Sequence, residues 1–287
     1  MSSLREAITR AAKKLHKAKL VYGHGTTNAL DEAAFLALEG LGLPLDIPDR
    51  KLDKQITAKQ QARIDGLIGQ RIQTRKPAPY LVGRAYIQGI PFRIDERVIV
   101  PRSFIGELMF NDNFIGTHKI TRVLDLCTGS GCLAILAALK FPKAKVDAVD
   151  LSTDALSLAQ QNVNDHKLGR RIHLHQGDLF APLKGQKYDL IITNPPYVSA
   201  SSMRRLPPEY KHEPRLALAG GTDGLDLVKR ILKDAPKFLT PHGAMMCEIG
   251  AGRKALERAF PKMPFLWLET ELSTDEVFWL TREQLAR

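Results

Sequence analysis

The part of the chain after Pro101 alternates short apolar runs with segments of helical periodicity, and this alternation constrains the fold more than any other feature. It is typical of an α/β fold, an open and mostly parallel sheet with helices on both faces. The strands we expect are residues 122–127, 145–150, 173–176, 188–193, 244–249, 265–269 and 277–280. No helical pattern separates the last two strands, so we expect this seven-stranded sheet to have an antiparallel edge.

Residues 1–85 carry apolar side chains three and four positions apart, which predicts helices. One such face contains Leu4, Ile8, Ala11 and Leu15. Another helix has a clear start, because Thr57 followed by Gln60 predicts a capping box, and it must end before Pro77. We place four basic residues on the polar outer face of this helix: Lys59, Arg63, Arg71 and Arg75.

Residues 86–103 connect the helical part to the α/β part. Residues 86–87 predict a strand, residues 89–91 a turn and residues 92–94 a returning strand, so we expect a β-hairpin. The chain then has three parts: a helical substrate-recognition domain at 1–85, the hairpin connector at 86–103 and the α/β domain at 104–287.

The composition predicts neither a membrane protein nor a secreted one. The chain has 287 residues, of which 44% are hydrophobic and 25% are charged, and no window is apolar enough to span a bilayer. Residues 1–19 scatter basic side chains among apolar ones, which a secretory signal does not permit, so we expect a cytoplasmic location. Three cysteines without CxxC spacing argue against a disulfide framework and against a zinc site.

The net charge of +11 favours an acidic or nucleic-acid-bearing partner through long-range attraction. The basic residues are spread along the chain rather than grouped, so a generally basic surface explains the same charge. Charge alone therefore leaves the partner open.

A glycine-rich turn follows the first predicted strand. Residues 125–131 read DLCTGSG, and a helical segment begins at Cys132. Glycines there let the backbone bend sharply and approach a ligand, while the amides at the helix start face it. The second strand ends in Asp150, whose carboxylate can accept hydrogen bonds from both hydroxyls of a ribose. Together these features predict an adenosine-containing cofactor at the carboxyl edge of the sheet.

Two kinds of cofactor fit this turn. Gly129, Gly131 and Ala134, with Asp150 downstream, also match the dinucleotide fingerprint, so a nicotinamide enzyme is a competitor. Asp125 favours S-adenosylmethionine instead, because a carboxylate there suits an ammonium group and repels a pyrophosphate.

Asp178 and Leu179 follow the third predicted strand. The carboxylate of Asp178 can accept from an adenine amino group, and Leu179 can cover a face of the ring. An acid at a strand end is equally common as a plain turn or cap residue, so these two residues do not decide between the cofactors.

The run Asn194, Pro195, Pro196 and Tyr197 follows the fourth predicted strand at the same edge. The nitrogen of an amide or aromatic amine has a delocalised lone pair, so its methylation requires acceptors that hold the NH2 group. The side-chain oxygen of Asn194 and the carbonyl of Pro195 can both accept. The prolines stiffen the backbone and remove donors, and Tyr197 offers an aromatic face to a planar group. The alternative is a simple strand-ending turn.

The position of this run beside the glycine turn predicts methyl transfer from S-adenosylmethionine to a planar nitrogen. Catalysis depends on alignment and on withdrawal of amide proton density, without a metal or a covalent intermediate. The cofactor-binding residues we expect are Asp125, Cys127, Thr128, Gly129, Ser130, Gly131, Asp150, Asp178, Leu179 and Asn194.

These motifs, together with KPAPYLVG at 76–83, HEPRLAL at 212–218 and GGTDGL at 220–225, resemble those of the glutamine N(5)-methyltransferases that modify translation proteins. The resemblance extends over nearly the whole chain. It implies a Rossmann-like class I methyltransferase domain with S-adenosyl-L-methionine as cofactor. It also implies that residues 194–197 bind the substrate glutamine.

The family has two main bacterial branches, which modify peptide release factors and the third protein of the large ribosomal subunit. Residues 100–108 read VPRSFIGEL, without the acidic pair that the release-factor branch usually carries after Pro-Arg, and residues 277–281 read VFWLT. Both stretches resemble the ribosomal branch, which implies a glutamine of that ribosomal protein as substrate. Cys127 and Thr128 depart from the family, whose loop usually has a smaller or differently ordered pair. We expect little consequence, because backbone contacts dominate such a turn.

Three alternatives stay open: a release factor as substrate, an adenine or cytosine amino group in nucleic acid, and a non-catalytic assembly factor that binds the cofactor structurally. A base must be flipped out and read, and no separate target-recognition domain is evident. The ribosomal interpretation places the positive charge near RNA, in an assembly intermediate. Segment 198–219, with Arg204, Arg205, Lys211 and Arg215, is then either a partner-reading lid or a surface connection.

Overall fold

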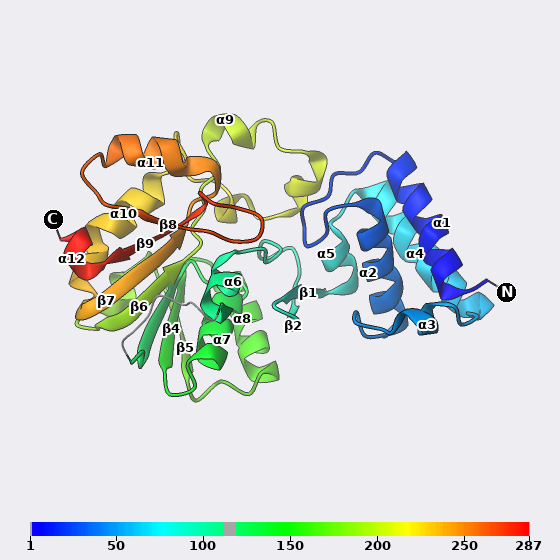
Figure 1. Cartoon of the computed structure of the whole chain (residues 1–287), viewed down its shortest axis with the longest axis horizontal. Coiled ribbons are helices and arrows are strands. Elements are labelled where there is room, and N and C mark those ends of the chain that lie inside the picture. Colours follow the sequence, from blue (N-terminus) through cyan, green and yellow to red (C-terminus); the bar gives the residue numbers. More distant parts are fainter. Residues whose placement is uncertain (1, 112–118, 287) are drawn as a thin grey trace. The chain divides into compact units, whose positions relative to one another are not determined.

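Two compact units make up the computed structural model, which describes residues 2–111 and 119–286 (Figure 1). The helical unit comprises Met1–Ala85, Ile94–Glu96 and Leu206–His212. The α/β unit comprises Tyr86–Arg93, Arg97–Arg205 and Glu213–Arg287. None of the helices among the described residues is both long enough and apolar enough to cross a membrane.

Helices surround a single apolar core in the helical unit. They are α1 (Leu4–Lys17), α2 (Ala29–Leu41), α3 (Asp49–Leu52), α4 (Ala58–Thr74) and α5 (Ala78–Val82). The predicted capping box between Thr57 and Gln60 is present at the start of α4. The apolar faces of α1, α2 and α4 meet at Leu15, Leu36 and Ile64, which are fully buried.

Our prediction that the side chain of Arg71 lies on the outer face of its helix, α4, is wrong. Arg71 is 0% exposed, because it follows Ile64 by two helical turns and so lies on the same inward face. Its Nε donates to Oε1 of Glu32 at 2.8 Å, and its other two nitrogens donate to the carbonyls of Val21 and Arg75 at 3.0 Å each. The buried guanidinium is therefore fully engaged within the helical unit.

The connector contains a hairpin whose turn differs from the predicted one. β1 (Arg84–Ile87) and β2 (Ile90–Arg93) pair with each other. Gln88 and Gly89 form the turn with φ values of +52° and +71°, and two successive left-handed residues suit a two-residue hairpin. Our prediction of a turn at residues 89–91 is therefore wrong at Ile90 and Pro91, which belong to β2.

The α/β unit contains a seven-stranded sheet with the order β5-β4-β3-β6-β7-β9-β8. Its strands are β3 (Arg122–Leu126), β4 (Lys145–Asp150), β5 (Ile172–Gln176), β6 (Tyr188–Thr193), β7 (Leu239–Glu248), β8 (Leu266–Leu268) and β9 (Val277–Thr281). Strands β3 to β7 run parallel, whereas β9 is antiparallel to both β7 and β8. The antiparallel strand thus lies one position inside the edge, which is β8.

Helices cover both faces of this sheet over two apolar cores. The α-helices are α6 (Ile105–Phe110), α7 (Cys132–Lys140), α8 (Thr153–Asp165), α9 (Ala200–Met203), α10 (Asp226–Asp234), α11 (Arg253–Ala259) and α12 (Arg282–Leu285). Short 3-10 helices of this unit occur at Ala181–Leu183, Arg215–Ala217, Ala235–Lys237 and Gly250–Gly252, and a further one, Pro208–His212, belongs to the helical unit. Val123 belongs to the core that contains α7, and its neighbour Leu124 to the core that contains α10, as strand alternation requires.

Candidate active site

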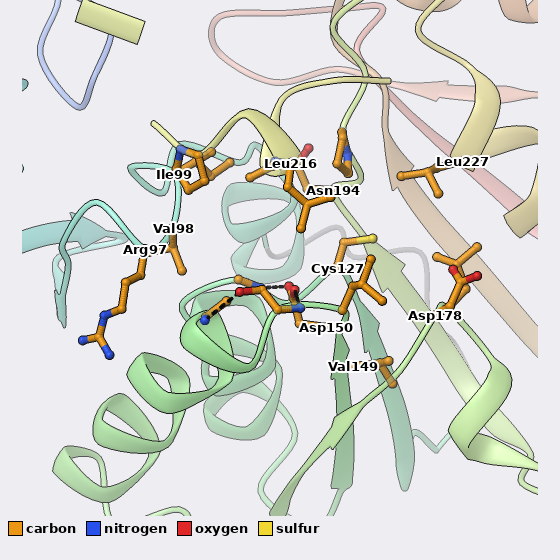
Figure 2. A pocket seen from close by; sticks show the side chains of 18 of the residues that line it. Arg97, Val98, Ile99, Cys127, Val149, Asp150, Asp178, Asn194, Leu216 and Leu227 are labelled. Carbon is orange, nitrogen blue, oxygen red and sulfur yellow. Dashed lines mark hydrogen bonds between the residues drawn. The ribbon is translucent and has the colours of Figure 1, made fainter. Parts of the chain in front are cut away.

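A pocket lies at the carboxyl edge of the parallel strands, and the described residues that line it all belong to the α/β unit (Figure 2). It encloses about 790 Å³, part of it open to solvent. The predicted site residues that line it are Cys127, Gly129, Asp150, Asp178, Leu179, Asn194 and Pro196. The predicted residues outside this lining are Asp125, Thr128, Ser130, Gly131, Pro195 and Tyr197.

The glycine turn after β3 has a left-handed backbone at alternate positions. Cys127, Gly129 and Gly131 have φ values of +58°, +55° and +79°. A Cβ on Gly131 would lie 3.2 Å from the Cβ of Ala159, so α8 packs closely against the turn. The conformation of Cys127 gives a physical reason for a smaller residue at this position, since the left-handed region favours glycine.

Asp150, at the end of β4, faces the pocket and holds the glycine turn. Its Oδ2 accepts from the N–H of Gly129 at 2.8 Å, and its Oδ1 accepts from the N–H of Ser152 at 2.9 Å. Burial raises the pKa of Asp150 above its ordinary value, and these N–H donors offset part of the rise. Each carboxylate oxygen has further lone-pair capacity, so Asp150 can still accept from ligand hydroxyls.

Asp125 lies within β3, beneath the turn, and is fully buried. Its Oδ2 accepts from the hydroxyl of Thr128 and from the N–H of Ala134 at 3.0 Å. Its Oδ1 is buried and has no hydrogen-bond partner among the described residues. Burial raises the pKa of Asp125 to about 7, and the two donors limit that rise. One carboxylate oxygen at the base of the turn is therefore still available to a donor.

Asp178 and Leu179 follow β5, and both line the pocket. Oδ2 of Asp178 lies 2.6 Å from a guanidinium nitrogen of Arg230, in an ion pair whose side chains are each about half exposed. The carboxylate that we expect to accept from an adenine amino group thus already pairs with a cation through one oxygen. Leu179 has a φ of +50°, and Leu227 lines the same pocket. These leucines supply apolar surface for a ring.

Asn194 follows β6 and lines the pocket together with Pro196 (Figure 2). In the part of the chain that the structure describes, no group forms a hydrogen bond with the side-chain amide of Asn194. Pro195 is buried, and Tyr197 is half-buried. An amide at a pocket wall without an internal partner can bind a ligand through both its oxygen and its NH2 group.

Glycines pack directly against the backbone and ring of the run 194–197. A Cβ on Gly220 would lie 2.7 Å from the carbonyl oxygen of Pro196, and one on Gly224 would lie 2.4 Å from that of Tyr197. A Cβ on Gly250 would lie 2.6 Å from the ring of Tyr197. The GGTDGL stretch, which the sequence marks only as a family signature, therefore supports the predicted substrate motif sterically.

The wall of the pocket that the sequence does not predict comes from residues 97–99 and from Pro214, Leu216 and Ala217. Glu213 fixes these two segments to each other, because its carboxylate binds Arg102 through two hydrogen bonds of 2.6 and 2.9 Å and accepts from the N–H of Val100 at 2.9 Å. Glu213 lies in the HEPRLAL stretch and Arg102 in the VPRSF stretch. Neither stretch indicates by itself that these two side chains pair.

Comparison with known proteins shows which protein family this chain resembles. A family model described as Methyltransferase small domain matches residues 109–206. The ribosomal protein uL3 glutamine methyltransferase of Bradyrhizobium diazoefficiens is 52% identical, over 99% of this chain and 92% of that protein. The protein of the same name from Bordetella pertussis is 49% identical, over 99% of this chain and 97% of that protein. The chain belongs to this glutamine methyltransferase family.

Membership makes the chain an S-adenosylmethionine-dependent methyltransferase, and the nicotinamide alternative is not supported. Among solved structures, a methyltransferase from Pyrococcus furiosus matches with a TM-score of 0.50 at 17% identity, over 79% of this chain and 99% of that one. This likeness concerns the fold alone, and it agrees with the predicted Rossmann-like class I methyltransferase domain.

Proposed function

We propose that this methyltransferase transfers a methyl group to the side-chain amide nitrogen of a glutamine in ribosomal protein uL3. The observation that carries the proposal is Asn194, whose amide has no hydrogen-bond partner among the described residues and lines the pocket at the end of β6. Relatives that match nearly the whole chain are named for this substrate.

The pocket fits S-adenosylmethionine, which supplies an electrophilic methyl group when bound. Asp150 faces the pocket with lone pairs for the ribose hydroxyls, and Leu179 and Leu227 offer apolar surface to the adenine. Asp178 retains an oxygen for the adenine amino group. Asp125 is fully buried and lies outside the pocket lining, but its Oδ1, at the base of the glycine turn, has no partner in the described chain. We therefore assign this oxygen to a donor on the methionine end.

Other predicted cofactor contacts come from the backbone of the turn. Thr128, Ser130 and Gly131 lie outside the pocket lining, so we assign them to shaping the turn rather than to side-chain contacts. Cys127 and Gly129 line the pocket and can present backbone to the cofactor.

The chain's own residues would hold the glutamine amide. Oδ1 of Asn194 accepts one N–H of the substrate and the carbonyl of Pro195 accepts the other, so the NH2 group is fixed with its lone pair turned toward the methyl donor. Pro195 and Pro196 contribute no competing N–H. The ring of Tyr197, seated on Gly250, provides a face for the planar amide. Polarising both N–H groups favours the positive charge that develops at nitrogen as the methyl group leaves the sulfur of the donor, and loss of one of these protons to water then gives the neutral N-methyl amide.

The helical unit is our candidate for recognising the protein around the glutamine, because the cofactor pocket is complete without it. We also propose that the enzyme acts in the cytoplasm, on uL3 within an RNA-containing assembly intermediate. The net charge of +11 supports such a partner.

A labelling experiment tests the substrate assignment. The enzyme is incubated with isotopically labelled S-adenosylmethionine and, separately, purified uL3, a purified release factor and ribosomal RNA, and the methyl group is mapped by mass spectrometry. We expect label on a glutamine of uL3. Label on release factor alone overturns the ribosomal assignment, label on RNA overturns the protein substrate, and binding without any transfer supports the non-catalytic alternative.

A further inference from the structure

Arg230 lies on α10, beside the part of the pocket that we assign to the adenine. It follows Leu227 by three residues, so both side chains project from the same face of this helix. Leu227 and Asp178 both line the pocket (Figure 2), and Arg230 forms its ion pair with Asp178. One helix therefore supplies both apolar surface for the ring and a partner for the acid that follows β5.

Hydrogen bonds on both sides hold the backbone that carries Asp178. The N–H of Gly177 donates to the carbonyl of Asp150 at 3.0 Å, and the N–H of Ala181 donates to the carbonyl of Asp178 at 3.0 Å. A Cβ on Gly177 would lie 2.8 Å from the ring of Pro182, so the turn packs closely on itself. With the backbone held, the direction of the carboxylate depends on the side-chain rotamer of Asp178.

The carboxylate of Asp178 has one oxygen engaged and one open. Among residues 2–111 and 119–286, only Arg230 forms a hydrogen bond with this side chain, donating to Oδ2 at 2.6 Å. Arginine is not deprotonated in proteins, so the pair does not depend on titration of Arg230. Oδ1 is therefore the oxygen that a ligand in the pocket can use.

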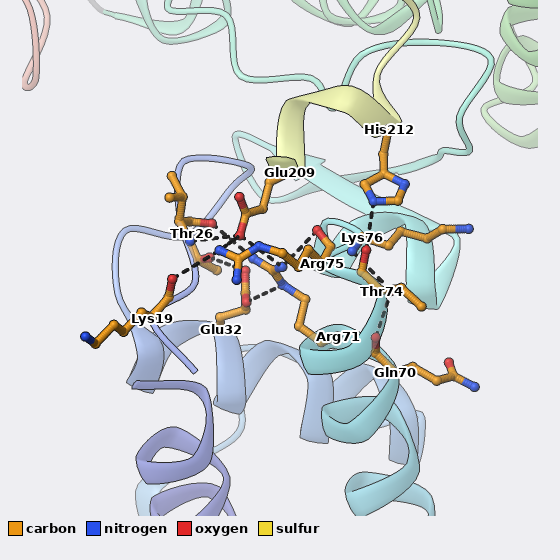
Figure 3. A network of polar contacts seen from close by, with 11 residues as sticks. Lys19, Thr26, Glu32, Gln70, Arg71, Thr74, Arg75, Lys76, Glu209 and His212 are labelled. Atoms are coloured by element: carbon orange, nitrogen blue, oxygen red, sulfur yellow. Dashed lines mark hydrogen bonds and ion pairs between the residues drawn. The ribbon is translucent and has the colours of Figure 1, made fainter. Parts of the chain in front are cut away.

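A buried arginine pair in the helical unit shows what distinguishes this one (Figure 3). Arg71 donates to Oε1 of Glu32 at 2.8 Å, and neither side chain is more than 1% exposed. That carboxylate is out of reach of a ligand. The side chain of Asp178 is 52% exposed and lines a pocket, so pairing with Arg230 leaves it accessible.

The pair between Arg230 and Asp178 suits ligand binding better than it suits stability. Water screens both charges, so an exposed ion pair of this kind contributes little to the free energy of folding. It does restrict the rotamers of the carboxylate, and an acceptor that is already ordered loses less side-chain freedom when a ligand binds. The pair thus prepares the remaining oxygen of Asp178 to accept a hydrogen bond.

We infer that Arg230 is a positioning residue for the cofactor, because it orders the Asp178 carboxylate that accepts from the amino group of adenine. The inference rests on the proposed contact between Asp178 and that amino group, and it requires nothing of the protein substrate. An ionised carboxylate only accepts hydrogen bonds, so it repels a purine that carries a keto oxygen in place of the amino group. Arg230 should therefore sharpen the selection of adenine over such a base.

Isothermal titration calorimetry with two cofactor analogues tests this inference. S-adenosylhomocysteine carries the amino group, and S-inosylhomocysteine carries an oxygen in its place. The variants are Arg230→Met, Arg230→Lys, Asp178→Ala and the double variant Arg230→Met, Asp178→Ala. Lys233→Met is the matched control, since Lys233 is an exposed cation on the same helix and lies outside the pocket lining. Thermal unfolding verifies that every variant is folded.

Wild type should bind S-adenosylhomocysteine at least about tenfold more tightly than S-inosylhomocysteine, the range for a hydrogen bond to a charged group. Arg230→Met should lower the affinity for S-adenosylhomocysteine about fivefold and change that for S-inosylhomocysteine less than about twofold. Arg230→Lys, which keeps the charge, should recover most of the loss. Lys233→Met should bind both analogues like wild type.

The double variant separates an effect through Asp178 from any other effect of Arg230. If Arg230 acts through Asp178, Arg230→Met has no further effect once Asp178 is alanine. An equal loss in both backgrounds would overturn the inference, and so would unchanged selectivity of the single Arg230→Met variant. Tighter binding of S-adenosylhomocysteine by Arg230→Met would also overturn it, because the arginine would then compete with the ligand for the carboxylate.

Failure of this inference can be told apart from failure of the proposed function. If Asp178→Ala keeps the wild-type preference for S-adenosylhomocysteine, the proposed adenine contact is wrong and the role of Arg230 is wrong with it. If Asp178→Ala loses the preference but Arg230→Met keeps it, only the role of Arg230 is wrong. Label on a release factor or on RNA would overturn the substrate assignment alone, because both analogues bind without a protein substrate.

Discussion

Two sets of buried carboxylates in this molecule, Glu32 with Glu209 in the helical unit and Asp125 in the α/β unit, are held in different ways. In the helical unit, Glu32 and Glu209 are paired with Arg71 and Arg75. In the α/β unit, Asp125 accepts only from neutral hydroxyl and N–H donors among the described residues. Ion pairs neutralise the first group, whereas the second leaves negative charge beside a pocket.

This difference separates stability from ligand binding. A carboxylate that an arginine neutralises has little left to offer a ligand, and removing the arginine leaves a buried charge. A carboxylate held by neutral donors keeps its charge for a cationic ligand, at the expense of a raised pKa.

Removing the central cation of the helical unit should have the largest effect. Arg71→Met should lower the free energy of unfolding by about 4 kcal/mol, because Glu32 and Glu209 stay buried without it. Burial already raises the pKa of Glu32, and Arg71 offsets part of that rise. Denaturant unfolding followed by circular dichroism measures the loss.

Arg63→Met, an exposed position on the same helix, is the matched control and should change stability by less than about 0.5 kcal/mol. S-adenosylmethionine affinity of folded Arg71→Met enzyme should stay near that of wild type, because the pocket lies in the α/β unit. A large loss of cofactor affinity with little loss of stability would contradict the proposed division of roles.

Asn194→Ala should lower methyl transfer and leave stability unchanged, which is the reverse of the effect expected for Arg71→Met. We expect methyl transfer to fall at least about a hundredfold, in the range for removal of one preorganised polar group. Stability should be nearly unchanged, because the amide has no hydrogen-bond partner among the described residues. Single-turnover transfer to uL3 and thermal unfolding give the two quantities.

Asn164→Ala, on the exposed side of α8, serves as the control for this change and should retain wild-type transfer. A variant of Asn194 that keeps full transfer would remove the residue from the catalytic role we propose.

The pKa of Asp125 predicts a pH effect of intermediate size. Because the folded-state pKa is about 7 and the ordinary value is 3.8, the folded protein binds the proton more tightly than the unfolded chain. Protonation of Asp125 therefore contributes stability that is fully present below about pH 3.8 and is lost as the pH rises from there through about 7. In this window the slope is at most about 1.4 kcal/mol per pH unit.

Unfolding free energies of wild type and Asp125→Asn, measured without cofactor at pH 5, 6 and 7, test this prediction. Their difference should change with pH, since the variant lacks this titration while all other groups titrate in both proteins. Parallel pH profiles would mean that burial does not raise the pKa of Asp125. The contrast between Asp125 and the ion-paired carboxylates of the helical unit would then weaken.

The left-handed backbone at Cys127 predicts the smallest effect. At most sites alanine is more stable than glycine, but a φ of +58° should reverse this order. We expect Cys127→Gly to be more stable than Cys127→Ala by about 1 kcal/mol. Thermal unfolding of the two variants decides, and a more stable alanine variant would indicate that the turn relaxes.

Much of the α/β unit could be predicted because its strands are continuous apolar runs and its turn carries glycines at fixed spacing. The pairing of β3 with β4 and β6 follows from that pattern, and it brings the loops after these strands to one edge. Arg71 could not be predicted as buried from its residue type, since a lone arginine on a helix is usually exposed. Its spacing from Ile64 contained the signal, but only the presence of Glu32 opposite makes burial tolerable.

By itself the sequence determined the fold class and the family, because these depend on local periodicity, glycine spacing and side-chain type. It also predicts the chemistry of the run 194–197. Tertiary structure alone decided which carboxylates are neutralised and which stay available. It paired Glu213 with Arg102, and Glu209 with Arg75, over separations of more than a hundred residues. Such pairs depend on where the folded chain brings charges together in a low-dielectric interior, and no local pattern specifies that.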